Sequence, residues 1–138
     1  MIVLDASVLA GAVGDDGADG RAARNRLLLE GDAAIPDLAY VETVAVLRKR
    51  WRIGHLSDRR FKDAVGQLLE LPIDPYPTGP LMTRAYELRA NVTAYDVCYV
   101  ALAEGLRCTL LTGDARLSRA PGARCAIEVF AAAGQAGR

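Results

Sequence analysis

The sequence predicts an α/β fold, a three-layer α/β/α sandwich around a mostly parallel central sheet. Short apolar runs without alternation, such as residues 2–4 and 108–112, are typical of strands that helices cover on both faces. Longer segments with helical spacing of apolar residues separate these runs, and strands that alternate with helices form right-handed crossovers in a parallel sheet. At 138 residues the chain fits one domain with a single core.

Glycines, prolines, capping residues and apolar runs predict the helices and strands in chain order. Residues 2–4 lead into a helix, and the glycines and aspartates of 14–17 separate it from an amphipathic one. Pro36 and Asp37 start a third helix with Asp37 as its cap, and Gly105 ends the last long helix. The expected strands are residues 2–4, 33–35, 72–75, 108–112 and 126–129, and the expected helices are 6–13, 18–30, 38–51, 59–71, 81–89 and 93–104.

The domain is expected to cover residues 1–130, and residues 131–138 to form a frayed C-terminal tail. In the amphipathic helix over residues 18–30, four side chains are expected to face the core: Ala22, Leu27, Leu28 and Leu29.

Composition excludes several classes of protein. With 51% hydrophobic and 25% charged residues the chain is not disordered, and no apolar run approaches the ~20 residues that cross a bilayer. The first apolar run meets Asp5 at once, unlike a secretory signal, so a cytoplasmic location is expected. The three cysteines show neither C-x-x-C spacing nor accompanying histidines and are expected to be reduced and mostly buried: Cys98, Cys108 and Cys125.

Positive charge is concentrated in one part of a chain whose net charge is zero. Residues 21–62 carry ten bases against five acids, so any nucleic-acid surface is expected there. Within this part, cations flank an aromatic ring that can stack on a base: Arg48, Lys49, Arg50, Trp51 and Arg52. The alternative is a solvated helix end whose cations offset the carbonyl dipole.

Four acids stand in or beside apolar stretches: Asp5, Glu42, Asp96 and Asp114. A buried carboxylate is costly unless it is protonated, hydrogen-bonded or shares a cation. Asp5 and Asp114 follow predicted strands, and ligands of such folds bind at the carboxyl ends of strands. Each of them also precedes a helix, residues 115–119 in the case of Asp114, where an acid can serve as a cap.

The other two acids lie in helices. Thr93 and Asp96 fit a capping box, so capping alone is an alternative to metal ligation. Glu42 lies inside a helix, with Leu38, Ala45 and Val46 within about 40° of it, so its carboxylate is expected to project from an apolar stripe. The alternative for Glu42 is an ion pair at the helix boundary, with Arg48 or Lys49.

Four carboxylates that converge would make a hard-metal site. A site without His or Cys ligands favours Mg²⁺ or Mn²⁺ over zinc. One or two such ions can activate water and stabilise the leaving oxygen of a phosphodiester, which is the chemistry of a metal-dependent nuclease. The hydroxyls of Ser7 and Thr112 would support the site by binding a water or the second oxygen of an acid, unless they bind local backbone.

These residues resemble those of PIN-domain ribonucleases, and more specifically of VapC-type toxins of bacterial toxin–antitoxin pairs. Residues 3–9, Glu42, residues 95–103 and residues 110–117 carry the resemblance, which covers nearly the whole chain. It implies a PIN-like fold and an endoribonuclease that leaves 5′-phosphate and 3′-hydroxyl ends. The implied metal ligands and catalytic residues, for Mg²⁺ or Mn²⁺, are Asp5, Glu42, Asp96 and Asp114.

The resemblance also implies a homodimer without membrane contact, neutralised by a VapB-type antitoxin whose C-terminal segment enters the pocket. The basic segment 48–52 would then meet RNA, the antitoxin or the second subunit, and Arg116 joins it as a candidate contact. In the family the fourth acid is the most variable and is sometimes joined by a further acid nearby, whereas Ala115 and Arg116 follow Asp114 here.

The main alternative is a PIN-fold interaction module whose acids no longer turn over substrate. A phosphorelay receiver would need a second acid beside Asp5 and a lysine after a late strand, whereas Lys49 and Lys62 both lie in helical segments. A haloacid-dehalogenase-type phosphatase would need an acid where Ser7 stands. His55 is expected at the surface, and two aromatic residues near Asp96 are expected in the core: Tyr95 and Tyr99.

Overall fold

The computed structural model describes residues 1–130, and the predicted tail over 131–138 lies outside the described part. Its five strands are all parallel and follow the order β3-β2-β1-β4-β5, which confirms the predicted fold class. The strands are β1 (Ile2–Leu4), β2 (Ala33–Pro36), β3 (Asp74–Tyr76), β4 (Thr109–Thr112) and β5 (Ile127–Val129). The helices are α1 (Ala6–Gly14), α2 (Ala18–Glu30), α3 (Leu38–Arg52), α4 (Asp58–Glu70), α5 (Met82–Glu87) and α6 (Ala94–Leu106), with 3-10 turns η1 (Gly79–Leu81) and η2 (Leu117–Arg119).

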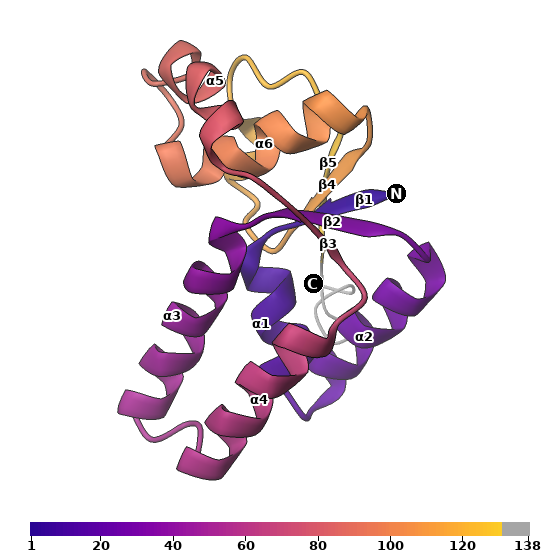
Figure 1. Cartoon of the computed structure of the whole chain (residues 1–138), viewed down its shortest axis with the longest axis vertical. Coiled ribbons are helices and arrows are strands. Elements are labelled where there is room, and N and C mark those ends of the chain that lie inside the picture. The colour runs from indigo at the N-terminus through magenta and orange to yellow at the C-terminus, as the bar shows by residue number, and fades with distance from the viewer. Residues whose placement is uncertain (131–138) are drawn as a thin grey trace.

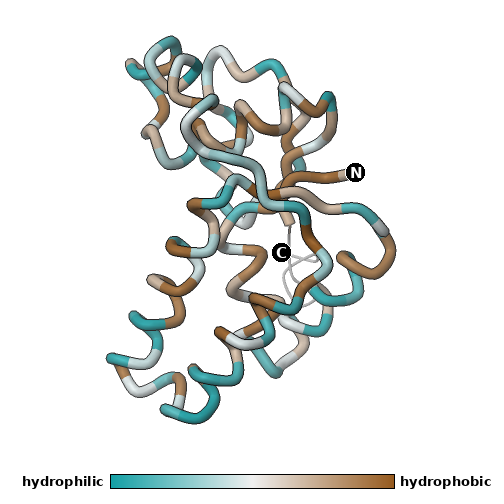
Figure 2. Tube along the Cα trace, viewed as in Figure 1, coloured by the Kyte–Doolittle hydropathy of each residue, from teal (hydrophilic) through white to brown (hydrophobic). Residues whose placement is uncertain are grey.

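The sheet separates two groups of helices. Helices α1 to α4 lie on one side, and α5 and α6 lie on the other (Figure 1). The central strands are buried on both faces, and Val3, Leu4, Leu110 and Leu111 have no exposed surface. Figure 2 shows hydrophobic residues along β1 and α1, and largely hydrophilic outer turns on α3 and α4. The apolar runs therefore behave as predicted, because strands covered on both faces need no polar alternation.

The topology fixes where a site can form. From β1 the chain proceeds to β2 and β3 on one side, and only β4 and β5 occupy the other side. Strand β1 is therefore the point at which the strand order reverses, and ligands of open α/β sheets bind there, beyond the carboxyl ends of the strands. The Asp5 backbone N–H donates to the Leu111 carbonyl at 3.2 Å and holds these two strand ends together.

The inward face predicted for α2 is wrong for two of its three leucines, whereas Leu27 is partly buried and packs against the core. Leu28 and Leu29 are 81% and 84% exposed, whereas Gly20 and Ala23 are buried. Small side chains bring α2 close to α1, and a Cβ built on Gly20 would lie 1.7 Å from the Asp15 carbonyl oxygen. This close approach sets how α2 is rotated about its own axis, so Leu28 and Leu29 face outward.

Two helix boundaries also differ from expectation. Asp37 precedes α3 without capping it, because its carboxylate accepts hydrogen bonds from the Thr78 backbone N–H (3.2 Å) and hydroxyl (2.5 Å). Gly105 does not end α6, which continues to Leu106 and is closed by Arg107 in the left-handed region at φ 55°. The Cys108 N–H then donates to the Ala103 carbonyl at 3.0 Å, so hydrogen bonding rather than glycine terminates the helix.

Several smaller expectations have mixed outcomes. Cys98 is buried and the other two cysteines are partly buried, and all three are free thiols, as predicted. His55 is exposed, as predicted. Tyr95 was expected in the core but is 63% exposed, whereas Tyr99 is buried. Across residues 1–130, every helix is too short or too polar to span a membrane.

Candidate active site

Asp5 is the most firmly held of the four acids. It follows β1 and caps α1, because its Oδ1 accepts a hydrogen bond from the Val8 N–H at 3.2 Å. The same oxygen accepts the Ser7 hydroxyl proton at 2.5 Å, and Oδ2 accepts that of Thr112. Asp5 is buried, so these donors offset the loss of hydration. The predicted roles of Ser7 and Thr112 on an acid's oxygens agree with these contacts.

The loop after β4 is tied to the start of α1 by the same hydroxyls. Ser7 Oγ accepts the Gly113 N–H, and Thr112 Oγ1 accepts the Asp114 N–H, each at 3.0 Å. A Cβ on Gly113 would lie 2.9 Å from Ser7 Oγ, so the absence of a side chain permits this approach. Gly113 was not singled out from the sequence, although its place between a strand end and an acid is a usable signal.

Glu42 is half-buried in α3 and receives a hydrogen bond from another layer of the fold. The Tyr99 hydroxyl of α6 donates to Glu42 Oε1 at 2.7 Å. Neither Arg48 nor Lys49 forms an ion pair with it within residues 1–130. The expected apolar stripe is confirmed only in part, because Leu38 and Val46 are partly buried but Ala45 is exposed. The fully buried face of α3 consists of Ala39, Thr43 and Leu47.

Asp96 lies in the first turn of α6 and is half-buried. Its backbone N–H donates to Thr93 Oγ1 at 3.2 Å, which is one half of the predicted capping box. Tyr99 follows three residues later on the same face of this helix. This spacing is the signal by which Tyr99 could have been grouped with the acids rather than with the core.

Mutual repulsion links the acids electrostatically. Burial, followed by the charges of Asp96 and Asp5, raises the pKa of Glu42 above its usual range, against the lowering effect of the Tyr99 hydrogen bond. Burial, followed by the charges of Asp114 and Asp5, likewise raises the pKa of Asp96. Each of the four acids therefore acts on at least one of the others. Contacts place them in one region of the fold: Thr112 bonds to Asp5 and to the Asp114 backbone, and Asp114 and Asp96 line one cavity. Tyr99 connects Glu42 to the helix that carries Asp96.

Asp114 differs from its neighbours because a cation already accompanies it. Its Oδ1 accepts the Arg116 backbone N–H at 2.9 Å, and the Arg116 guanidinium lies 3.3 Å from each carboxylate oxygen. These hydrogen bonds hold the pKa of Asp114 below its usual value. The helix expected over residues 115–119 is only the 3-10 turn η2, so Asp114 forms a local turn with Arg116 rather than capping a longer helix.

The donor set fits a hard divalent cation in its chemistry. All four side chains offer carboxylate oxygens, and the raised pKa values of Glu42 and Asp96 reflect burial and then neighbouring negative charge, both of which a bound cation would offset. Within residues 1–130 no three Asp, Glu, His or Cys side chains are close enough to hold one ion as they lie. Shared ligation by three acids would therefore require side-chain movement, and any ligand set that includes Asp114 would compete with Arg116 for its carboxylate.

The basic segment of α3 is only partly available for RNA. Trp51 Nε1 donates to Asp58 at 2.5 Å, and its ring packs against Phe61 with centroids 6.2 Å apart. Arg50 points toward α1, with Nη1 3.5 Å from the Ala10 carbonyl oxygen. It also lines a cavity of about 190 Å³ together with Ser7 and Gly113. The remaining side chains of the segment are exposed: Arg48, Lys49 and Arg52.

A second cavity, of about 300 Å³, adjoins two of the acids. We call it the acid–arginine groove and define it by Asn91, Val92, Thr93, Asp96, Asp114, Arg116, Leu117, Arg119, Ala120 and Pro121. Sequence reasoning identified Asp96, Asp114 and Arg116 but missed Arg119 and Asn91. The groove forms only when the start of α6 meets η2, two segments that no local sequence pattern connects.

The raised pKa of Glu42 predicts how a Glu42→Gln variant behaves without metal. Folding partly buries Glu42 and places it near other acids, so at pH 7 its ionised carboxylate lowers the free energy of unfolding. As pH falls through the raised folded pKa toward the usual value of 4.5, the group becomes protonated in the folded state first and this penalty disappears. Urea unfolding in EDTA should therefore find the Gln variant more stable than wild type at pH 7, with a smaller difference near pH 4.5.

A Tyr99→Phe variant is the matched control, because it removes the O–H donor and leaves the charge of Glu42 in place. It should change stability at pH 7 in the opposite direction, toward a lower free energy of unfolding. A Gln variant that is less stable than wild type at pH 7 would contradict the electrostatic account of this site.

Comparison with known proteins identifies the family. Residues 2–123 match the model of the PIN domain. Ribonuclease VapC9 of Mycobacterium tuberculosis is 39% identical over 132 residues, which cover 94% of this chain and 98% of the relative. Ribonuclease VapC1 of the same species is 38% identical over 128 residues, covering 92% and 96% of the two chains.

Solved structures agree at the level of the fold. VapBC2 from Rickettsia felis, bound to a DNA fragment from its promoter, has a TM-score of 0.66 at 16% identity and covers 95% of this chain and 100% of that one. The VapC20 toxin of M. tuberculosis, described as cleaving the sarcin–ricin loop, has a TM-score of 0.64 at 18% identity, covering 88% and 95%. The chain therefore belongs to the PIN-domain family and, within it, to the VapC ribonucleases.

Proposed function

We propose that the protein is a Mg²⁺- or Mn²⁺-dependent endoribonuclease that acts as the toxin of a toxin–antitoxin pair. The observation that carries this proposal is the group of four acids around the carboxyl ends of β1 and β4, where burial and then the charges of neighbouring acids raise the pKa values of Glu42 and Asp96. A site that is held negative in this way favours a divalent cation and, through it, a phosphodiester. The relatives named as ribonucleases support RNA as the substrate.

The chain's own residues would prepare the site for that chemistry. Ser7 and Thr112 orient both oxygens of Asp5, and Tyr99 orients Glu42. Thr93 fixes the backbone at Asp96. The cation, when bound, would polarise the phosphodiester and lower the pKa of water to supply the nucleophile. Asp5, Glu42, Asp96 and Asp114 are accordingly the proposed metal ligands. The hydroxyl groups that donate to these acids are the proposed positioning groups, and they belong to Ser7, Thr112 and Tyr99.

We also propose a VapB-type antitoxin as partner, a homodimer as the active form and the cytoplasm as the place of action. Support for the antitoxin comes from solved relatives in which VapB or another antitoxin is present, such as VapBC2 of R. felis and a toxin–antitoxin complex of Klebsiella pneumoniae. Exposed Leu28 and Leu29 on α2, beside an apolar groove that includes Leu71 and Ile73, offer surface that a protein partner would cover.

The test is cleavage of a total-RNA pool by antitoxin-free protein in Mg²⁺, in Mn²⁺ and in EDTA. The expected result is discrete fragments with 5′-phosphate ends in either metal and none in EDTA. A parallel thermal melt should show stabilisation by Mn²⁺, because a ligand present at 100 times its dissociation constant adds about 2.7 kcal/mol to the free energy of unfolding.

The two measurements together separate the enzyme from a catalytically silent interaction module. Stabilisation by Mn²⁺ without any fragment, across a pool that contains transfer, ribosomal and messenger RNA, would favour the silent module. Fragments that persist in EDTA would reject the metal-dependent mechanism.

A further inference from the structure

The acid–arginine groove is lined by charges of both signs. Asp96 and Asp114, two of the proposed metal ligands, share its lining with Arg116 and Arg119. Asn91 and Thr93 supply neutral hydrogen-bonding groups. A strand whose scissile phosphate lies at the acids would pass these cations with its neighbouring phosphates.

The turn η2 holds the two arginines in a fixed frame. The Leu117 N–H donates to the Asp114 carbonyl at 3.1 Å, and the Arg119 N–H donates to the Arg116 carbonyl at 3.1 Å. The Leu117 side chain is buried and anchors the turn to the core. Both arginine side chains therefore extend from a backbone that is tied directly to a proposed ligand.

The arginines differ in how they are engaged. The Arg116 side chain is 87% exposed, and its guanidinium contacts Asp114 at 3.3 Å, which is an ion pair of the weak, solvated kind. Its charge also acts on Asp96. Arg119 is exposed, and its guanidinium forms no ion pair within residues 1–130. Arg119 is therefore available to an anion at once, and Arg116 after it leaves Asp114.

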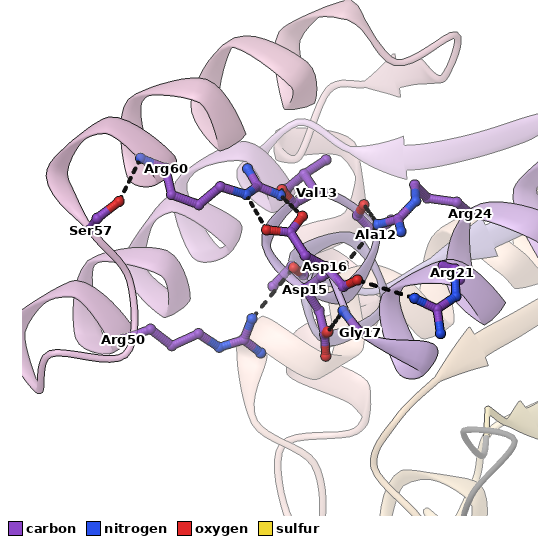
Figure 3. A network of polar contacts seen from close by, with 11 residues as sticks. Ala12, Val13, Asp15, Asp16, Gly17, Arg21, Arg24, Arg50, Ser57 and Arg60 are labelled. Atoms are coloured by element: carbon purple, nitrogen blue, oxygen red, sulfur yellow. Dashed lines mark hydrogen bonds and ion pairs between the residues drawn. The ribbon is translucent and has the colours of Figure 1, made fainter.

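The basic residues near α1 are less suited to RNA. Figure 3 shows Arg24, Arg50 and Arg60 directed at the C-terminal half of α1 and the loop after it, where they meet backbone carbonyls and Asp16. The cavity beside Arg50 is also lined by Asp15 and Asp19, so its charge does not favour a polyanion. The excess of bases over residues 21–62 therefore overstates the cationic surface of this part of the molecule.

We propose that the acid–arginine groove binds the single-stranded RNA that adjoins the scissile bond, with Arg116 and Arg119 each contacting a phosphate and Arg116 leaving Asp114 to do so. This inference rests on the proposed ribonuclease function. Arg119 sets affinity for the strand, and Arg116 alternates between a proposed metal ligand and the substrate.

The test uses Glu42→Gln protein to prevent cleavage, with Mg²⁺ present and a short fluorescent single-stranded RNA of mixed sequence as probe. Fluorescence anisotropy gives the dissociation constant over a series of salt concentrations. Arg119→Ala in this background should raise the dissociation constant about threefold to fivefold, and lower the slope of its logarithm against the logarithm of salt by about 0.7. Arg124→Ala is the matched control, because Arg124 is exposed and precedes β5, at the amino ends of the parallel strands, whereas Asp114 follows the carboxyl end of β4.

The release of Arg116 is tested without RNA. Titration calorimetry with Mn²⁺ should find that Arg116→Ala, in the wild-type background, binds the metal up to about fivefold more tightly, because nothing competes for Asp114. Arg119→Ala should change the Mn²⁺ affinity less than Arg116→Ala does, because Arg119 forms no ion pair with Asp114.

The outcomes separate failure of the proposed RNA-binding groove from failure of the proposed ribonuclease function. If the Glu42→Gln parent binds RNA and Arg119→Ala matches Arg124→Ala in affinity and salt slope, the groove is rejected while the ribonuclease stands. If the parent binds no RNA and the wild type cleaves none, both proposals fail. An unchanged Mn²⁺ affinity in Arg116→Ala would overturn the competition for Asp114.

Discussion

An Asp96→Asn variant is expected to lose RNA cleavage by roughly two to three orders of magnitude while it keeps its fold. The loss follows if Asp96 ligates the cation, because a ligand charge worth several kcal/mol of transition-state stabilisation is removed. The fold should persist because the bond from the Asp96 backbone N–H to Thr93 does not depend on the side chain. Initial rates of cleavage in Mn²⁺, with circular dichroism and thermal melts, measure both parts.

The alternative for Asp96 is capping without catalysis, and the same variant separates the two. Removing a charge that other acids and burial already disfavour should make the metal-free Asn variant at least as stable as wild type at pH 7. Unfolding of the variant would favour the capping role. Asp63→Asn is the matched control, because it makes the same chemical change at an exposed residue of α4, away from the four acids.

The fold could be predicted because its central signals are local. Residues of β1 and β4 are apolar on both faces, and only a covered parallel strand accommodates such runs next to helical segments. Glycines and prolines also mark most boundaries. The errors concern which face of a helix is buried. Leu28 and Leu29 are more hydrophobic than Gly20 and Ala23, yet the small residues lie on the buried face of α2 because they allow close helix packing.

The candidate site was predictable to the extent that topology determines it. Asp5 and Asp114 follow from one rule, that the carboxyl ends of neighbouring parallel strands meet. The partner of Glu42 did not follow from any rule, because Tyr99 lies 57 residues away and its hydroxyl is placed by the packing of α6. The exposure of Ala45 beside Glu42 has the same origin, since the face that α3 buries is set by its packing against α1 and α4.

The largest effect on stability is expected from Gly20→Ala. The new Cβ would lie 1.7 Å from the Asp15 carbonyl oxygen and 2.6 Å from its carbon, inside any allowed contact. The Asp15 carbonyl cannot easily move away from the new Cβ, because Arg24 Nη1 donates to this carbonyl and to that of Ala12, each at 2.9 Å (Figure 3). We expect the free energy of unfolding to fall by more than about 3 kcal/mol, or the protein not to fold.

Gly66→Ala makes the same chemical change where the structure offers open space. Gly66 lies within α4, is exposed, and has nothing within 4 Å of a built Cβ. Replacing it should raise the free energy of unfolding by about 0.5–1 kcal/mol, because alanine restricts the unfolded chain and favours the helix. Urea unfolding of the two variants should therefore give changes of opposite sign. Similar values for both would mean that the approach of α2 to the Asp15 loop does not limit stability, and that the outward turn of Leu28 and Leu29 has another cause.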